Sequence, residues 1–300
     1  MLVSTSTSNN NRFGFEDNLK MLKAAGFTAF DLTLCSGKDA VTLTPPFDGE
    51  DYIEKAKECR KFVDGLGLPC NQAHAVFSSD VGAAKKGTAM FEATVRSMEV
   101  ASIMGAKSVV IHPMQYLPYM QNVEFLKQEN LEFYTDLLPY AEKLDIIMLT
   151  ENMWQCNPNN GHIIQSTCAE AKEFAEYVDM IGSPYLKACL DIGHTCLTGE
   201  SIANMIKTLG KDRLFGLHIH DVDAINDSHT LPYTLKVDFA EMIDALAEIG
   251  YEGDITFEAE NFFRPFPDAL VPSAAKLMAD IGHYFASEIG KKSLLKNSAE

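Results

Sequence analysis

Eight short apolar runs alternate with longer amphipathic segments along the chain, and this alternation restricts the fold more than any other feature of the sequence. The runs are rich in β-branched residues and predict strands at 1–7, 27–34, 69–76, 108–114, 146–152, 186–193, 214–221 and 254–261. Helical patterns lie between them, for example at 15–26, 49–67, 87–106 and 239–250. These four helices are expected to stop at glycines, namely Gly26, Gly67, Gly105 and Gly250.

Eight strand–helix units in 300 residues are the count of a (β/α)8 TIM barrel. A doubly wound sheet is the rival fold, but it would carry a glycine-rich phosphate turn after the first strand, and residues 4–14 (STSTSNNNRFG) contain no GxGxxG pattern. No linker or low-complexity segment divides the chain. The sequence therefore predicts an α/β protein with a single TIM-barrel domain over residues 1–300.

The charge balance argues against nucleic acid and membrane partners. The chain has 42 acidic against 25 basic residues, a formal charge of −17, and no basic run longer than two lysines. No stretch has the apolar length of a membrane span, and the amino terminus lacks the features of a signal peptide. Seven scattered cysteines without a CxxC motif indicate reduced thiols. We expect a cytoplasmic protein whose carboxyl-terminal residues 291–300 are frayed.

Metal-capable side chains gather at the carboxyl ends of the predicted strands. In chain order they are His74, His112, Glu151, Asp191, His194, His218, His220, Asp221, Asp223, Asp227, His229, Glu258 and Glu260. The carboxyl ends of barrel strands meet at one face, where barrel enzymes build their sites. Carboxylates inside otherwise apolar strands are costly to bury unless they are paired or bind a cation. The pattern therefore predicts a site for a divalent ion.

The predicted ligands come from the last four strands. Two glutamates, one aspartate and one histidine give a mixed oxygen and nitrogen shell that suits Mn²⁺, Co²⁺, Mg²⁺ or Zn²⁺. Of the two histidines on the seventh strand, His220 is favoured as the ligand because it lies closer to the strand end. His218 is expected one layer deeper, where it would support the ligands or contact substrate, and Cys189 is expected to be a core residue.

Five segments, VVIHP, LTENM, LDIGHT, HIHDVDAINDSHTLP and GYEGDITFEAEN, resemble the xylose isomerase-like TIM-barrel superfamily. The resemblance covers nearly the whole chain, and the superfamily includes sugar phosphate isomerases and epimerases, inosose dehydratases and endonuclease IV. It implies a metal held by Glu151, Asp191, His220 and Glu258. It also implies that Glu151 and Glu258 are the catalytic residues, which move a proton on a ketose through a cis-enediolate.

Other residues are predicted to bind the substrate, a sugar or a cyclitol. By resemblance His194 contacts it, and His74, His112, Trp154, His218, Asp227 and His229 are further candidates. Trp154 could stack on a sugar face or pack on the barrel rim. Arg264 is expected to pair with a carboxylate rather than with a substrate phosphate. Ketohexose epimerases of this kind have a glutamate and an arginine where this chain has Asn157 and Asn226, so their substrate is not carried over.

Three alternatives remain open. A lyase would use the same metal to dehydrate an inosose or to cleave a glycoside. A non-catalytic barrel protein would bind no metal. Endonuclease IV holds three zincs with nine residues, and this chain can supply a matching set: His74, His112, Glu151, Asp191, His194, His220, Asp227, His229 and Glu258. The predicted loops around the mouth carry almost no lysine or arginine, which argues against DNA as the substrate. The sequence does not show the oligomeric state, and we expect a homo-oligomer because most soluble oligomers are of this kind.

Overall fold

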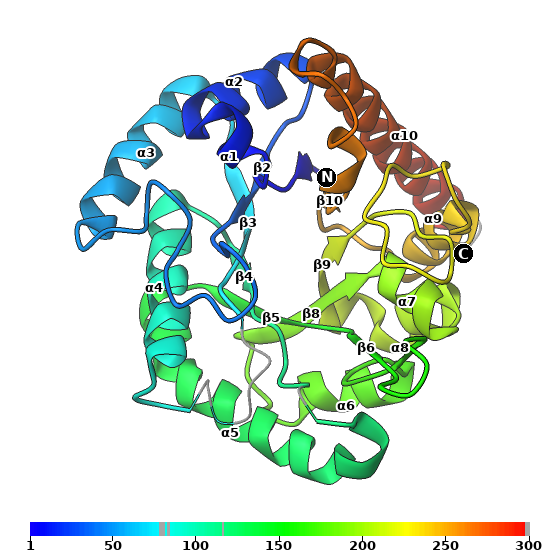
Figure 1. Cartoon of the computed structure of the whole chain (residues 1–300). Helices are drawn as coiled ribbons and strands as arrows, with labels where there is room; N and C mark the ends of the chain where they lie inside the picture. Colours follow the sequence, from blue (N-terminus) through cyan, green and yellow to red (C-terminus); the bar gives the residue numbers. More distant parts are fainter. Residues whose placement is uncertain (78–81, 83–84, 116, 298–300) are drawn as a thin grey trace.

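The computed structural model describes residues 1–77, 82, 85–115 and 117–297. Eight parallel strands form a ring with helices around it (Figure 1). The strands are β1 (Val3–Thr5), β2 (Phe30–Thr33), β3 (Cys70–His74), β4 (Ser108–Val110), β5 (Ile147–Glu151), β8 (Leu186–Asp191), β9 (Leu214–His218) and β10 (Ile255–Phe257). Each lies within one of the eight predicted runs and is shorter than it; β4, β8 and β9 begin at the predicted residue and are shorter only at their carboxyl ends.

The ring closes through two kinds of contact. Six strands form a continuous parallel ladder in the order β2-β3-β4-β5-β8-β9, and β1 pairs with β10. Single bridges from Ser6 to Asp31 and from Ile219 to Phe257 join these two sheets. The prediction of a TIM barrel is therefore confirmed, and the carboxyl ends of all eight strands meet at one mouth.

Helices follow the strands around the outside of the ring (Figure 1). They are α1 (Asn10–Phe13), α2 (Phe15–Ala25), α3 (Tyr52–Leu66), α4 (Ala89–Met104), α5 (Tyr119–Leu144), α6 (Ala171–Asp179), α7 (Ile192–Thr198), α8 (Ile202–Arg213), α9 (Phe239–Ile249) and α10 (Val271–Asn297), with 3₁₀ turns η1 (Glu260–Phe263) and η2 (Asp268–Leu270). The four predicted stop glycines are confirmed: each caps its helix at a positive φ, between 66° and 105°.

Two parts of the chain differ from the sequence prediction. A short antiparallel hairpin, β6 (Trp154–Cys156) with β7 (Ile163–Gln165), is inserted between β5 and α6. The expectation of a frayed tail is wrong for residues 291–297, because α10 continues to Asn297. Lys292 and Lys296 pair with Asp244 and the Glu248 carbonyl of the neighbouring α9, which holds this last turn in place. Residues 298–300 lie outside the described residues.

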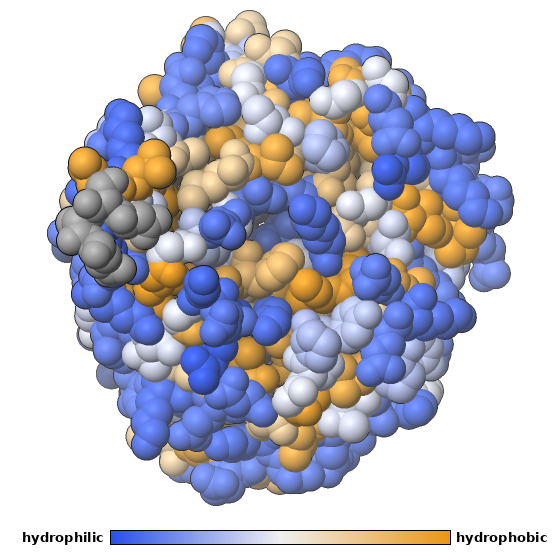
Figure 2. Space-filling model, turned by 180° about the vertical axis from the view of Figure 1, so that it is seen from behind, coloured by the Kyte–Doolittle hydropathy of each residue, from blue (hydrophilic) through white to orange (hydrophobic). Residues whose placement is uncertain are grey.

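Apolar packing fills the space between the strands and the surrounding helices, whereas the interior of the ring is small and partly polar. Val110, Leu149 and Cys189 form a separate buried cluster, and Cys189 is fully buried, as expected for a core residue. Behind it, the amino ends of the strands surround a cavity of about 370 Å³ lined by Asn71 and Asp254 among others. Figure 2, seen from behind, shows a hollow at the centre of the face with hydrophilic residues around it.

No helix in the described part of the chain is long and apolar enough to cross a membrane.

Candidate metal centre

A cavity of about 1110 Å³ occupies the mouth at the carboxyl ends of the strands. Most of the predicted site residues line it, namely His74, His112, Glu151, Trp154, His194, Asp227, His229 and Glu258. Three further predicted residues, Asp191, His218 and His220, are fully buried. The cavity is large enough for a sugar-sized ligand.

Four of these residues converge on one point. Single donor atoms of Glu151, Asp191, His218 and Glu258 lie within 4.8 Å of one another. His218 Nδ1 is 2.8 Å from Glu151 Oε1 and 3.2 Å from Glu258 Oε2. The structure therefore brings together the three predicted carboxylates, but the histidine among them is His218 rather than His220.

The position of the strand end explains this difference. The sequence predicts a strand to residue 221, whereas β9 ends at His218. His218 pairs in register with Asp191, the last residue of β8, so both side chains lie at the same level of the barrel. His220 lies two residues further along, and its Nε2 is 3.0 Å from Asp191 Oδ2. Barrel register, which the sequence does not display, therefore places His218 among the three carboxylates and leaves His220 in contact with Asp191; that His220 binds an ion stays a prediction.

A second group shares Glu151 with the first. His74 Nε2 lies 2.9 Å from His112 Nε2, and His112 Nε2 lies 2.9 Å from Glu151 Oε2. Two ring nitrogens that face each other at this distance need a proton or a cation between them, because two lone pairs repel. The arrangement is typical of nitrogen ligands around a metal.

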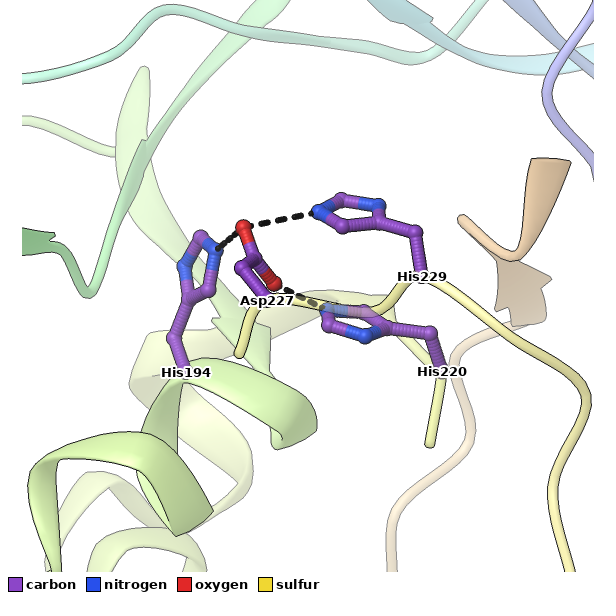
Figure 3. Close-up of side chains that lie close together, drawn as sticks. All are labelled: His194, His220, Asp227 and His229. Carbon is purple, nitrogen blue, oxygen red and sulfur yellow. Dashed lines mark hydrogen bonds and ion pairs between the residues drawn. The ribbon is translucent and has the colours of Figure 1, made fainter. Parts of the chain in front are cut away.

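A third group stands beside Asp191 and surrounds Asp227. His229 Nε2 and His194 Nε2 lie 3.0 Å and 3.5 Å from Asp227 Oδ2, and His220 Nε2 lies 3.8 Å from Asp227 Oδ1. Figure 3 shows the three rings arranged around this single carboxylate. The His220 and His229 rings are stacked, with centroids 4.1 Å apart. The four residues form a compact cluster in which one donor atom from each lies within 4.8 Å of the others.

Backbone carbonyls orient three of these histidines. Nδ1 of His74, His194 and His229 lies 2.8–3.0 Å from the carbonyl oxygens of Ala75, Asn152 and Glu258, respectively. A carbonyl oxygen can only accept, so each Nδ1 carries the hydrogen and donates it. In the neutral ring the lone pair is then on Nε2. This atom faces His112 in the case of His74, and it faces Asp227 in the case of His194 and His229. Metal-binding histidines in proteins are commonly fixed in this way.

Buried atoms without partners test whether these groups fit a metal. Among the described residues, His220 Nδ1 is buried and makes no hydrogen bond. Glu151 Oε2 and Asp227 Oδ1 are buried and make no well-formed hydrogen bond, although His112 Nε2 and His220 Nε2 lie 2.9 and 3.8 Å from them. Buried carboxylate oxygens and ring nitrogens are costly to leave unpaired. The two carboxylate oxygens belong to donor groups in which carboxylate oxygens and imidazole nitrogens converge, which is the shell that Mn²⁺, Co²⁺ and Zn²⁺ accept. The residues therefore fit a divalent ion.

The pKa shifts show strong pairing of acids with histidines. Burial alone would raise the pKa of Glu151, but His218 and His112 outweigh it and hold the pKa well below its usual range. Burial lowers the pKa of His74 to about 4, and the neighbouring His112 acts in the same direction. Burial would also lower the pKa of His194, but Asp191 and Asp227 raise it to about 10. The carboxylates Asp191 and Asp227 therefore favour positive charge within the third group.

Two predicted residues have roles that only the structure shows. Trp154 Nε1 donates to Asp227 Oδ2 over 3.1 Å, and its ring meets His194 edge-on. Arg264 lines the cavity, and among the described residues the expected pairing with a carboxylate is not found. Trp154 thus contacts the third group directly, whereas Arg264 stands at the rim.

Asp221, also singled out from the sequence, holds a loop instead of pointing into the cavity. Its two carboxylate oxygens accept hydrogen bonds from five backbone N–H groups, those of Val222, Thr234, Leu235, Lys236 and Val237, at 2.7–3.0 Å. The loop between β9 and α9 carries Asp227 and His229. Asp221 therefore fixes the segment from which two donors of the third group come.

Sequence reasoning missed Asp31, Gln72 and Asn152. Asn152 bonds the Asp191 backbone through both ends of its amide, at 2.7 and 2.9 Å, and so joins β5 to β8. Gln72 Nε2 lies 3.0 Å from His218 Nε2. Asp31 lines the cavity from β2, and burial raises its pKa to about 7. The sequence could have indicated Asn152, because it directly follows Glu151. Gln72 and Asp31 lie near the site only because the ring of strands closes, which the sequence does not show.

The sequence matches the family model described as "Xylose isomerase-like TIM barrel" over residues 19–281. The chain belongs to this family. The match covers most of the chain, including all of the donor residues described above.

Two proteins are similar to this chain in sequence. A protein of Methanocaldococcus jannaschii is 28% identical over 196 residues, 63% of this chain and 64% of its own length. A D-psicose 3-epimerase of Enterocloster bolteae is 24% identical over 246 residues, 81% of this chain and 76% of its own length. The matches to the first curated relatives cover 46–64% of their lengths.

Solved structures share the fold at low identity. A D-tagatose 3-epimerase-like protein superposes with a TM-score of 0.72 at 20% identity and covers 97% of this chain and 99% of its own. An IOLI protein solved with a bound zinc atom has a TM-score of 0.70 at 16% identity and covers the same shares of the two chains. These likenesses support the barrel fold.

Proposed function

We propose that this protein is a divalent-metal-dependent isomerase or epimerase of a ketose or a related polyhydroxy ketone. The observation that carries the proposal is the convergence of Glu151, Asp191, His218 and Glu258 at the base of a sugar-sized cavity. Relatives named as D-psicose 3-epimerase and fructoselysine 3-epimerase support this class of reaction.

In this proposal the four residues would hold the ion. The bound ion would supply Lewis-acid polarisation of a substrate carbonyl, which makes the neighbouring C–H proton easier to remove. A shell of three carboxylates and one imidazole suits Mn²⁺, Co²⁺ or Mg²⁺, and zinc in the IOLI structure makes Zn²⁺ a further candidate.

Glu151 and Glu258 are the proposed proton carriers. Glu151 is the last residue of β5 and Glu258 directly follows β10; their carboxylates lie 2.8 and 3.2 Å from the same atom, His218 Nδ1. The Glu258 side chain is 19% exposed and faces the cavity, whereas the Glu151 side chain is 1% exposed. Return of the proton to the same face of the carbon would make an isomerase, and exchange between the two faces would make an epimerase.

Solvent exchange tests the proposal directly. The metal-replete protein, incubated in D₂O with a panel of ketoses and inososes, is expected to incorporate deuterium at the carbon next to the carbonyl. EDTA should abolish the exchange, and E258Q should lower its rate by about 100-fold or more, as expected for loss of a general base. E252Q, at an exposed residue at the other end of the barrel, is the matched control and should leave the rate unchanged.

The same experiment separates the lyase alternative. Loss of water or of an aglycone, detected by NMR of the products, would assign the protein to the dehydratases or glycoside lyases, because proton abstraction is common to both routes. If the metal-replete protein exchanges no substrate on the panel, the proposal is wrong.

The three adjoining donor groups favour a second candidate, a three-zinc phosphodiesterase of the endonuclease IV type. They contain the set predicted for three zincs, with His218 in the first group and His220 beside Asp191. Against DNA, Lys38 and Arg264 are the only basic residues that line the described cavity. Three zincs per chain together with nicking of abasic duplex DNA would support this candidate, and a single ion with no cleavage would exclude it.

A further inference from the structure

Asp31 stands in the described cavity without an assigned role. It is the second residue of β2, and side chains along a strand point alternately to opposite faces. Phe30 and Leu32 belong to the core packed against the helices, whereas Asp31 and Thr33 line the cavity at the mouth. The pleat of β2 therefore directs the Asp31 carboxylate into the barrel.

The carboxylate of Asp31 lacks a partner. The residue is 1% exposed, and its Oδ1 atom makes no hydrogen bond to any described residue. Its backbone, in contrast, is paired on both sides, since its carbonyl accepts from Thr7 N at 2.9 Å and the residue pairs with Gln72 of β3. A buried carboxylate oxygen without a partner is costly, so a group from outside the chain is the natural partner.

A metal ion does not account for Asp31. The donor groups close enough to share an ion include no atom of Asp31. Asp31 nevertheless faces the same cavity as Glu151 and Glu258, and only β1 separates β2 from β10, which precedes Glu258. Asp31 thus stands on the wall next to the proposed reaction centre, one strand away from it.

We propose that Asp31 binds a hydroxyl group of the polyhydroxy substrate and thereby contributes to choosing which sugar is accepted. This inference rests on the proposed function, because it takes the occupant of the cavity to be a polyol. A hydroxyl group suits the position, since it can donate to the free carboxylate oxygen without bringing a second charge into the cavity. A site built to pair with a substrate hydroxyl discriminates strongly against an analogue that lacks it.

The test combines protein variants with substrates that lack one hydroxyl. Wild-type protein, D31N and D31A are compared on the ketose that exchanges fastest and on its monodeoxy analogues. D31A is expected to lower kcat/KM for the parent ketose by roughly 10- to 100-fold, mainly through KM. For one deoxy analogue, wild type and D31A should be equal, because the missing hydroxyl is the partner of Asp31. D31N keeps the shape of the side chain, so it replaces D31A in this comparison if D31A fails to fold.

Two further readouts separate substrate binding from a structural role. Trp154 is the only tryptophan of the chain and lines the same cavity, so its fluorescence reports ketose binding without turnover. D31N should weaken this binding and leave the metal content unchanged. D48N removes the same charge from a position in the β2–α3 segment outside the cavity and is expected to behave as wild type.

Distinct results overturn the inference and the function on which it rests. Wild-type activity on a ketose, with D31N and D31A unchanged on every substrate of the series, would refute the role of Asp31 alone. Loss of metal from D31N would also refute it, since Asp31 would then act on the ion. Absence of exchange and of fluorescence change with all polyols in the wild type would remove both proposals.

Discussion

Replacement of Gly193 by alanine tests the packing of the third donor group. Gly193 lies in the first turn of α7, and a Cβ atom at this position would stand 2.1 Å from His220 Cε1. His220 is fully buried, and the stacked ring of His229 lies on one of its faces. The ring therefore has little room to move away, and the added methyl group must displace it or shift the helix.

The expected cost follows from this contact. Overpacking in a well-packed interior typically costs 1–3 kcal/mol, and a 2.1 Å contact places G193A at about 3 kcal/mol. Alanine returns about 1 kcal/mol of helix propensity, so the net loss of unfolding free energy is about 2 kcal/mol. G65A is the matched control, because Gly65 lies inside α3 and a Cβ atom added there would have no atom within 4 Å. G65A should be more stable than wild type by about 1 kcal/mol.

Urea denaturation of both variants measures the difference, expected to be about 3 kcal/mol between G193A and G65A. Metal content provides a second readout, since displacement of His220 should weaken ion binding by the third group. A G193A protein that is as stable as G65A would refute the reasoning, because it would mean that His220 is not confined by its neighbours.

Three further predictions concern pH, a loop and the ion. Burial raises the pKa of Glu173 from 4.5 to about 7, so the fold favours its protonated form, and this contribution to stability is lost as the pH rises from 4.5 through 7. The unfolding free energy of E173Q relative to that of wild type should therefore rise by about 1–3 kcal/mol between pH 5 and pH 8, as measured by urea denaturation. A difference between the two proteins that is constant with pH would contradict this. D221N leaves some of the five backbone N–H groups of its loop unpaired, so it should cost about 2–4 kcal/mol of unfolding free energy and increase amide hydrogen exchange at 222–237. D223N, at a solvent-facing turn carboxylate, should cost much less than D221N. Addition of Mn²⁺ or Zn²⁺ should raise the thermal midpoint of the EDTA-treated wild type, and E151Q, which lacks the carboxylate shared by two groups, should lose most of that increase.

The fold could be predicted because its signals are local. Alternation of apolar runs with amphipathic helices, and the glycines that end those helices, depend on neighbouring residues only, and the barrel has them where the sequence places them. The β6–β7 hairpin was missed because its strands are three residues long and carry no continuous apolar pattern. The extension of α10 was missed because contacts with α9, distant in sequence, stabilise it.

The candidate site could be predicted as a set of residues but not as a geometry. The carboxylates at the strand ends were identifiable, since each interrupts an apolar run. That His218 rather than His220 lies among the three carboxylates depends on where β9 stops relative to β8, as the pairing of Asp191 with His218 shows. Asp31 was not identified because a single acidic residue in a strand does not indicate a site. Only the closed ring places its carboxylate in the cavity.

The backbone hydrogen bonds that Asp221 accepts from its loop affect how the sequence of this barrel can vary. One carboxylate just beyond the end of a strand sets the course of the sixteen residues that follow it, through amide groups that every amino acid except proline possesses. Side chains on the intervening stretch, such as Ile225 and Asn226, are therefore free to vary without moving the strand ends. A barrel organised in this way can acquire a new preference among sugars by altering a few exposed positions while its ion-binding groups keep their places.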